Sequence, residues 1–398
     1  MAKRQTRKSE QRLDEVRKAL AEGRAQDAWA YARNLLASHK PDARALSLAG
    51  AAAFQIGDVA QARDLLTDAV KLSPRDPHIQ MNLGNVLARL SDHTGALAAY
   101  QASHDLAPDY AEPAFNAGVL FAGQGDHINA AIWFAKARER DSDHVAAAVG
   151  LGEALKNAGN LSESKHVLET LVSSRPEDPI AHTNLAATLS ALGDDVAAKE
   201  VAARAVKLDP GLAAAHYNLG VAEQALGEDA RAVGCYRYAL ALEPMNAAAA
   251  LNLGEACLKS GDPIAAKTAF KRALDIDPGF AMAAVNLADL SLQDGRPLDA
   301  LDSIDQFLAQ NPGQPSALAF KAFAHRDAGE IKKARELDDA DRFIFENPVS
   351  PPSGYVDSAA FNQALAAHVT AHPTLMIAPR DHATVAGAHS ACRSMWTT

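Results

Sequence analysis

Small and apolar residues recur along the chain at helical spacing, and the whole pattern repeats every 34 residues. Within one period, Ala232, Tyr236 and Ala239 lie three or four positions apart, which places them on one face of a helix. Runs rich in Val, Ile and Thr, which favour strands, are scarce. The pattern therefore predicts an all-α chain built from helix–turn–helix units.

A glycine marks the same position of almost every period. Nine of ten positions spaced by 34 residues are glycine, and the tenth is serine. The series is Gly23, Gly57, Ser91, Gly125, Gly159, Gly193, Gly227, Gly261, Gly295 and Gly329. We expect each glycine to end a helix in the left-handed conformation. An acidic residue usually follows, near the start of the next helix, where negative charge is favoured.

Proline and alanine form two further series with the same period. Proline closes the second helix of each unit, because it cannot continue a helix. Its series is Pro74, Pro108, Ser142, Pro176, Pro210, Pro244, Pro278 and Pro312. Alanine is expected where two helices cross, because overpacking there would cost about 1–3 kcal/mol. Its series is Ala62, Ala96, Ala130, Ser164, Ala198, Ala232, Ala266, Ala300 and Ala334.

The three series divide the chain into units of equal length. The nine full units are 43–76, 77–110, 111–144, 145–178, 179–212, 213–246, 247–280, 281–314 and 315–348. A weaker unit at 9–42 keeps Gly23, Ala28 and Leu35 and is expected to cap the N-terminal end. Because one unit cannot bury its apolar face alone, we predict one stacked repeat domain over 9–348. Residues 1–8 are expected to be a basic, disordered N-terminus, and 349–398 a linker with a short tail.

This pattern resembles the tetratricopeptide repeat. Unit 213–246 matches the family pattern at six positions, which are Gly220, Gly227, Ala232, Tyr236, Ala239 and Pro244. The resemblance implies an α-solenoid, a right-handed superhelix in which the first helix of each unit lines the concave side. The repeats are especially similar to those of protein O-GlcNAc transferases, as in the segment CYRYALALEP. No glycosyltransferase domain follows in this sequence, so that activity is not expected.

Asparagine occupies position 6 in six of the nine full units. This asparagine row consists of Asn82, Asn116, Asn184, Asn218, Asn252 and Asn286. The resemblance implies that position 6 faces the groove. A carboxamide both donates and accepts hydrogen bonds, so each asparagine could pair with the peptide groups of an extended ligand. The alternative is a scaffold role, in which each amide satisfies a neighbouring carbonyl, since buried polar groups need partners.

Position 5 supplies two aromatic residues, Phe115 and Tyr217. We predict that they contact a bound peptide, with ordinary packing as the alternative. Few residues at positions 5 and 9 are basic. The chain therefore lacks the Lys and Arg set with which chaperone-binding members of the family hold a terminal carboxylate. The expected partner is a protein that presents an extended, partly apolar segment.

Charge and composition exclude other partners. The net charge is −10, so we expect no nucleic-acid binding. The one basic run, MAKRQTRKSEQR at the start, is interpreted as a solvated tail, with a nucleic-acid or membrane contact as the alternative. That run has no apolar segment, and no apolar run of 18 residues occurs, so neither a signal peptide nor membrane association is predicted. The three cysteines, Cys235, Cys257 and Cys392, fit neither a zinc pattern nor a disulfide framework. A cytoplasmic location is therefore expected.

No catalytic, cofactor or metal site is predicted in 9–348. The sequence His325-Arg326-Asp327 lies within a repeat helix and has no glycine-rich phosphate loop beside it, so a kinase site is not expected. Cys235 and Cys257 occupy apolar positions of the repeat and are expected to be small core residues rather than nucleophiles. We therefore predict a non-enzymatic scaffold for protein–protein interaction.

The tail resembles the opening of a 2-oxoglutarate/iron(II) dioxygenase domain that follows such repeats in some bacterial proteins. The matching residues are Phe361, Leu365, His372, Pro373, Thr384, Gly387 and Ser390. In that family the iron ligands lie farther downstream, whereas eight residues follow Ser390 here, so we expect a truncated or frameshifted copy without the catalytic core. His368 and His372 could chelate a metal but lack a third ligand. The alternative function is the substrate-docking part of such an oxygenase lineage.

Overall fold

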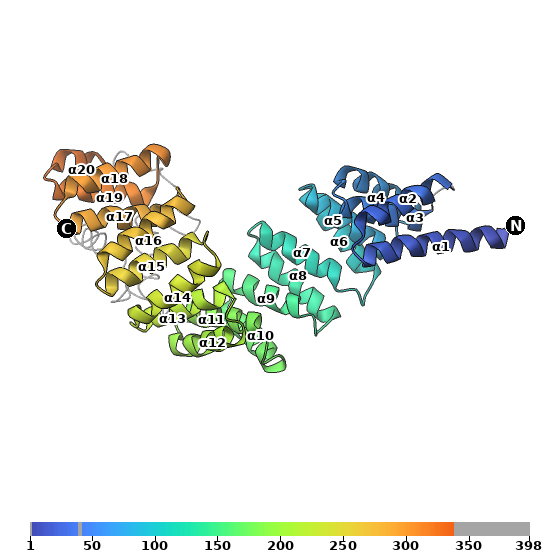
Figure 1. Ribbon diagram of the computed structural model, residues 1–398, viewed down its shortest axis with the longest axis horizontal. Coiled ribbons are helices and arrows are strands. Elements are labelled where there is room, and N and C mark those ends of the chain that lie inside the picture. Colours follow the sequence, from blue (N-terminus) through green and yellow to red (C-terminus); the bar gives the residue numbers. More distant parts are fainter. Residues whose placement is uncertain (1, 39–41, 338–398) are drawn as a thin grey trace, which may run out of the picture. The chain divides into compact units, whose positions relative to one another are not determined.

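The computed structural model describes residues 2–38 and 42–337, and every regular element in these two ranges is a helix. The helices come in pairs, one pair for each predicted repeat, and a tight turn joins the two helices of a pair (Figure 1). Odd-numbered helices are the first helices of the repeats, and even-numbered helices are the second helices. The all-α fold predicted from the periodicity is confirmed.

The described part of the chain divides into two compact bodies, an N-terminal body that ends at Leu226 and a C-terminal body that begins at Gly227. The N-terminal body contains α1 (Ala2–Ala21), α2 (Ala25–Ser38), α3 (Ala43–Gln55), α4 (Val59–Leu72), α5 (Pro77–Arg89), α6 (His93–Leu106), α7 (Glu112–Gly123), α8 (His127–Arg140), α9 (Val145–Asn157), α10 (Leu161–Ser174), α11 (Pro179–Leu192), α12 (Asp195–Leu208) and α13 (Ala213–Ala225). The C-terminal body contains α14 (Asp229–Leu242), α15 (Ala247–Lys259), α16 (Pro263–Ile276), α17 (Ala281–Gln293), α18 (Pro297–Gln310), α19 (Pro315–Asp327) and α20 (Ile331–Leu337). The boundary falls inside the predicted repeat 213–246.

The turn inside each repeat has the predicted left-handed residue. The nine glycines of the series have φ between 69° and 89°, and Ser91 at the tenth position has φ 61°. The carboxylates of five acidic residues then cap second helices, each accepting a hydrogen bond from the backbone amide three residues later. These residues are Asp58, Asp92, Asp126, Asp194 and Asp262. The glycine and the acidic residue together fix where the chain reverses direction.

In five repeats the core forms where a glycine on the first helix meets a large side chain on the second. A Cβ atom on Gly84 would lie 2.6 Å from the Tyr100 ring, and one on Gly152 would lie 2.6 Å from Leu168. All nine residues of the alanine series are fully buried. Its one serine, Ser164, donates a hydrogen bond to the carbonyl oxygen of Gly152 at 2.7 Å. The predicted close helix crossing is confirmed.

The first helix begins earlier than expected. The basic segment 1–8 is predicted to be disordered, but α1 is helical from Ala2. Its residues are mainly Lys, Arg, Gln, Glu and Ala, which are strong helix formers, and no Gly or Pro occurs before Gly23. Local helix propensity therefore extends the predicted capping helix toward the N-terminus.

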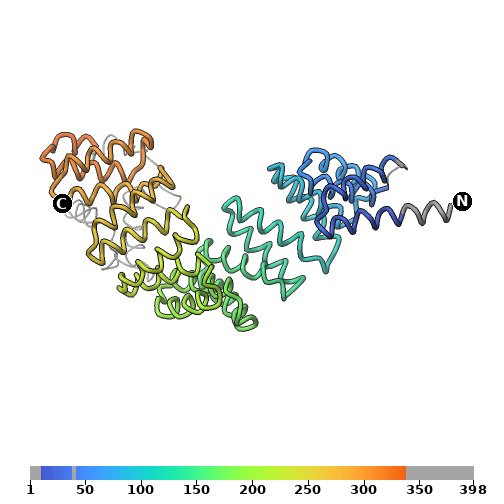
Figure 2. Tube along the Cα trace, viewed as in Figure 1, coloured from blue at the N-terminus to red at the C-terminus, as the bar shows by residue number. Residues whose placement is uncertain are grey.

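The first helices contact one another along the N-terminal body. Each of α1, α3, α5, α7, α9 and α11 packs against the first helix of the next repeat. Within the described residues, second helices of consecutive repeats do not pack closely on each other. The chain runs up and down through these pairs (Figure 2). Within this body the first helices therefore pack on one another more closely than the second helices do, and we call the side that they form the inner side.

Candidate peptide-binding face

Side chains at positions 5, 6 and 9 of the first helices meet at the junctions between repeats. Hydrogen bonds there join Asn116 of α7 to Asn85 of α5, and Asn218 of α13 to Thr183 of α11. We define the inner face as the surface formed by these three positions on α5, α7, α9, α11 and α13. Most of its side chains are half-buried, so they pack on a neighbouring helix and still reach solvent.

Asn116 belongs to a small hydrogen-bond network. Its Nδ2 donates to Oδ1 of Asn85 at 2.9 Å and lies 3.8 Å from Sδ of Met81. The Tyr100 hydroxyl donates to the same Asn85 oxygen at 2.9 Å. Burial raises the pKa of Tyr100 to about 12, so the hydroxyl keeps its proton at neutral pH. The network ties α5, α6 and α7 together.

Two more members of the asparagine row also donate across a repeat junction, and one donates within its own helix. Nδ2 of Asn218 donates to the Thr183 carbonyl oxygen at 2.9 Å, and Nδ2 of Asn286 donates to Glu255 at 3.3 Å. Asn184 donates to the Ile180 carbonyl of its own helix at 3.0 Å. Asn82 and Asn252 are half-buried like the others. The row thus contributes to the scaffold through its amino groups.

The carbonyl oxygens of the row have a different environment. Oδ1 of Asn116, Asn184 and Asn218 accepts no hydrogen bond from any residue in the described ranges. A carboxamide whose amino group is committed still has two acceptor lone pairs. The amino group of each of these asparagines therefore has a scaffold role, while its Oδ1 atom stays available to accept a hydrogen bond. Ligand contact by the row stays a prediction.

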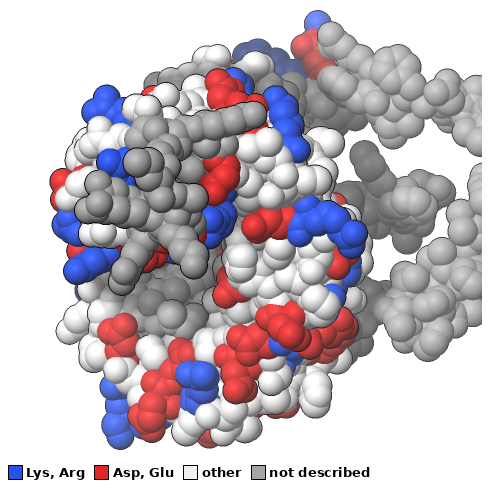
Figure 3. All heavy atoms as spheres, turned by 90° about the vertical axis from the view of Figure 1, so that its right-hand side faces the viewer, with Lys and Arg blue, Asp and Glu red and all other residues white. Residues whose placement is uncertain are grey.

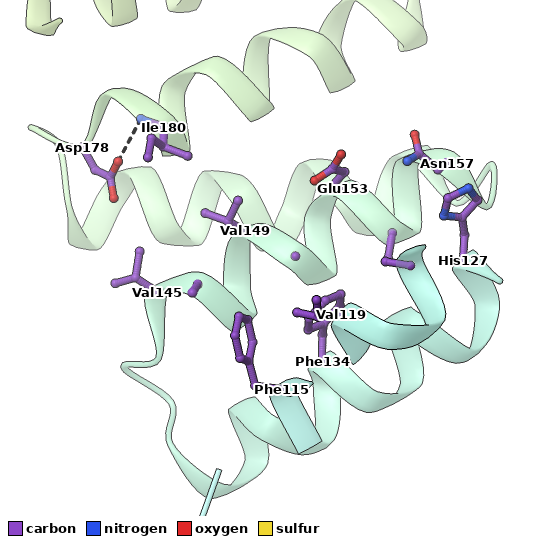
Figure 4. Close-up of a pocket in the computed structure, with 14 residues that line it drawn as sticks. Phe115, Val119, His127, Phe134, Val145, Val149, Glu153, Asn157, Asp178 and Ile180 are labelled. Carbon is purple, nitrogen blue, oxygen red and sulfur yellow. Dashed lines mark hydrogen bonds between the residues drawn. The ribbon is translucent and has the colours of Figure 1, made fainter. Parts of the chain in front are cut away.

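A pocket of about 570 Å³ opens on the inner face between α7, α9 and α11 (Figure 4). Its apolar walls come from Phe115, Val119, Phe134, Val145, Val149 and Ile180. The Phe115 and Phe134 ring centroids lie 5.7 Å apart, and Phe115 also contacts the His144 ring at 4.9 Å. Phe115 therefore both packs within the fold and borders the pocket. Tyr217, the other predicted aromatic contact, is half-buried on α13 and does not line this pocket.

The pocket lies where the asparagine row is interrupted. Position 6 of α9 is Gly150, whereas the repeats on either side have Asn116 and Asn184. The Phe134 ring approaches this glycine so closely that a Cβ atom there would be 2.8 Å from the ring. Gly150 therefore leaves room for the ring and removes the side chain that would otherwise cover the cavity.

Four polar side chains line the pocket, the carboxylates of Glu153 and Asp178, the amide of Asn157 and the imidazole of His127. None of the lining residues is Lys or Arg. The Asp178 carboxylate caps α11 by accepting hydrogen bonds from the amides of Ile180 at 2.9 Å and Ala181 at 3.2 Å. Glu153 is exposed and forms no ion pair with a described residue. The charge around the opening therefore favours a cationic neighbour.

Family models for the tetratricopeptide repeat match most of the chain. One matches residues 13–77, 52–111, 81–145, 217–281 and 285–345, and another matches 121–189. The chain belongs to the tetratricopeptide repeat family. Proteins of this family generally mediate interactions between proteins, and the inner face of the repeats is where this chain offers half-buried side chains and a pocket.

Individual relatives match parts of these repeats. A stretch of 109 residues is 30% identical to the Hsp70-Hsp90 organizing protein of Triticum aestivum and covers 27% of this chain and 19% of that protein. A tetratricopeptide repeat protein of Parabacteroides merdae has a similar solved structure, with 19% identity over 62% of this chain and 98% of that chain and a TM-score of 0.47. A thermophilic tetratricopeptide repeat protein of Thermus thermophilus is 23% identical over 46% of this chain and all of that chain, with a TM-score of 0.42.

The C-terminal body has half-buried acidic residues at position 9 of its repeats. Burial raises the pKa of Glu255 on α15 and of Asp289 on α17. Each carboxylate accepts a hydrogen bond from an amide, Glu255 from Asn286 at 3.3 Å and Asp289 from Gln293 at 2.7 Å. On the face drawn in Figure 3, which is the right-hand side of Figure 1, Asp and Glu side chains gather along the lower part, and Lys and Arg side chains lie in smaller, separate groups.

Two of the remaining sequence candidates, His325 and Cys257, are buried in helices. His325 is buried in α19, and its Nδ1 lies 2.7 Å from Glu330. Cys257 is buried, which raises the pKa of its thiol and disfavours the nucleophilic thiolate. Within residues 2–38 and 42–337, no group of His, Cys, Asp and Glu could hold a metal ion, and no helix has the length and apolarity that crossing a membrane requires.

The predicted tail lies outside the described residues. The oxygenase resemblance, the His368–His372 pair and Cys392 therefore stay predictions, as does the likeness to O-GlcNAc transferases. The inner-face pocket is the feature that sequence reasoning missed. Gly150 was its signal, because a glycine there breaks the asparagine row.

Proposed function

We propose that this chain is a non-enzymatic scaffold whose inner face binds an extended segment of a partner protein. The observation that carries this proposal is the junction between first helices. There, carboxamide oxygens without an intramolecular donor lie on the same face as an apolar pocket. A surface that offers acceptors and apolar walls together matches a polypeptide in extended form.

An extended segment presents backbone N–H groups at regular intervals and side chains on alternate faces. Asn184 and Asn218 stand at the same position of consecutive repeats, so their oxygens can accept from such N–H groups. Each hydrogen bond contributes roughly 0.5–1.5 kcal/mol net. These hydrogen bonds involve only the backbone of the partner, so they contribute affinity for any sequence. The pocket contributes a preference for particular side chains.

The Hsp70-Hsp90 organizing protein match supports a protein-binding role in general terms. It spans about a fifth of that protein's length, so that protein's partners are not carried to this chain. The alternative, a substrate-docking part of an oxygenase lineage, rests on the sequence resemblance of the tail alone.

The test compares two double variants of the full chain. Asn184 and Asn218 are changed together to Ala, which removes both the acceptor and the amino donor to the scaffold, or together to Asp, which removes only the amino donor and keeps an acceptor. A random 12-residue peptide library is first selected on the unmodified chain, and affinities of the synthetic peptides are measured by fluorescence anisotropy. The Ala variant should bind roughly 5- to 150-fold more weakly, from about 0.5–1.5 kcal/mol for each bond. The Asp variant should keep most of the affinity.

A matched control replaces two asparagines away from the inner face. Asn34 on α2 and Asn160 at the start of α10 are exposed, and neither side chain forms a hydrogen bond with a described residue. Their double change to Ala should leave affinity unchanged. Equal affinity of the Ala variant and the unmodified chain, with the fold intact by circular dichroism, would show that the asparagines are only scaffold. If the library yields no binding peptide at all, the proposed function is wrong.

A further inference from the structure

We propose that the pocket between α7, α9 and α11 binds a large apolar side chain of the partner segment, and that this side chain has a Lys or Arg next to it in sequence. This inference rests on the proposed function and gives the chemistry of the segment. The pocket would be the place where the scaffold selects its partner.

The exposure of the pocket walls supports an apolar ligand. Val119 of α7 is 48% exposed and Ile180 of α11 is 51% exposed, although both are aliphatic. They border one cavity together with Val149 of α9, which lies between them in the order of repeats. Apolar surface left open on several walls of one concavity gains most when an apolar group fills it.

The size of the pocket suits a side chain rather than a solvent molecule. Its volume of about 570 Å³ lies within the roughly 300–1,000 Å³ typical of ligand pockets. Phe134, which is 3% exposed, lies against Gly150 at its base. The base is therefore packed and preformed, so a ligand would not have to reorganise the core to enter.

The charge at the opening identifies the neighbouring residue. Glu153 and Asp178 line the pocket, and no Lys or Arg side chain does. Asp178 is held in place by its helix-capping hydrogen bonds, and Glu153 is exposed one repeat earlier. A Lys or Arg beside the apolar anchor would face these two carboxylates, whereas an acidic residue there would be repelled.

The inference is tested with the same selected peptides. The peptides enriched from the random 12-residue library should contain a large aliphatic or aromatic residue with Lys or Arg within two positions. Replacing that apolar residue with Ser in the synthetic peptide should weaken binding about tenfold or more. On the protein, Ile180→Ser should weaken binding to a similar extent. It should preserve the fold because the side chain is already half-exposed.

Two further variants test the glycine at the base of the pocket and the negative charge at its opening. Gly150→Asn restores the asparagine of the neighbouring repeats, should fill the pocket and should abolish the preference for the apolar residue. Because its Cβ atom would press on Phe134, its thermal unfolding is measured alongside. Glu153→Lys should weaken binding of the basic peptides, and the loss should shrink as salt is raised.

Matched controls carry the same chemical changes outside the pocket. Ile128→Ser alters a side chain on α8 that is 67% exposed, and Glu200→Lys alters an exposed charge on α12. Both should leave affinity unchanged. If the Asn184/Asn218 change to Ala weakens peptide binding but Ile180→Ser and Gly150→Asn leave it unchanged, the pocket proposal is overturned and the scaffold proposal stands. Selected peptides without an apolar residue, or peptides that circular dichroism shows to be helical when bound, would also overturn it.

Discussion

Ser91 provides a direct test of how the repeat turns are stabilised. It has φ 61°, in the left-handed region, at a position where the other nine repeats have glycine. Its side chain is exposed and forms no hydrogen bond with a described residue. The substitution Ser91→Gly therefore removes backbone strain without removing a side-chain contact. We expect this substitution to stabilise the N-terminal body.

The expected magnitude comes from two opposing contributions. An L-residue in the left-handed conformation costs about 1–2 kcal/mol. Introducing glycine lowers the unfolding free energy by about 0.5–1 kcal/mol, because glycine loses more backbone conformational entropy on folding than other residues do. The net gain should be about 0.5–1 kcal/mol. For a body of this size, such a gain raises the melting temperature by about 1–4 °C.

The assay is guanidinium denaturation of the full chain followed by far-ultraviolet circular dichroism. Because repeat proteins can unfold locally, hydrogen exchange of the amides in 77–110 is measured in parallel. Ser73→Gly is the matched control, since Ser73 ends α4 with φ −139°, where glycine offers no relief. That control should lose about 0.5–1 kcal/mol. Equal destabilisation by both substitutions would refute the assignment of strain to Ser91.

Two further predictions concern polar groups between first helices. Tyr100→Phe removes the hydroxyl that donates to Asn85 and should lower the unfolding free energy, measured by denaturant titration, by about 0.5–1.5 kcal/mol. An unchanged unfolding free energy would mean that this hydrogen bond does not stabilise the packing of the helices. Burial raises the pKa of Glu255, so the unfolded chain loses this proton at a lower pH than the folded one, and stability falls as pH rises through the folded pKa. Glu255→Gln should therefore raise the melting temperature at pH 7 and have little effect below the usual carboxyl pKa, and an equal effect at both pH values would contradict the burial argument.

Local features of the repeats could be predicted from sequence. The left-handed turn depends on one residue, and glycine marks nine of the ten turns, while the acidic caps and closing prolines act within one helical turn. The buried alanine series followed from its period alone. The start of α1 was predicted less well, because the basic charge of residues 1–8 suggested a solvated tail while their helix propensity favoured a helix.

The sequence alone determined the repeat, its boundaries and the helix that carries each asparagine, because these depend on spacing along one chain. Only the tertiary structure decided what the asparagines touch. Asn116 reaches Asn85 and Asn218 reaches the Thr183 carbonyl across a junction between helices, which no single repeat contains. The pocket is also lined by residues of four helices, and the absence of a side chain at Gly150 matters as much as the walls around it. Such contacts depend on how closely neighbouring repeats pack, and that distance is set by the whole core.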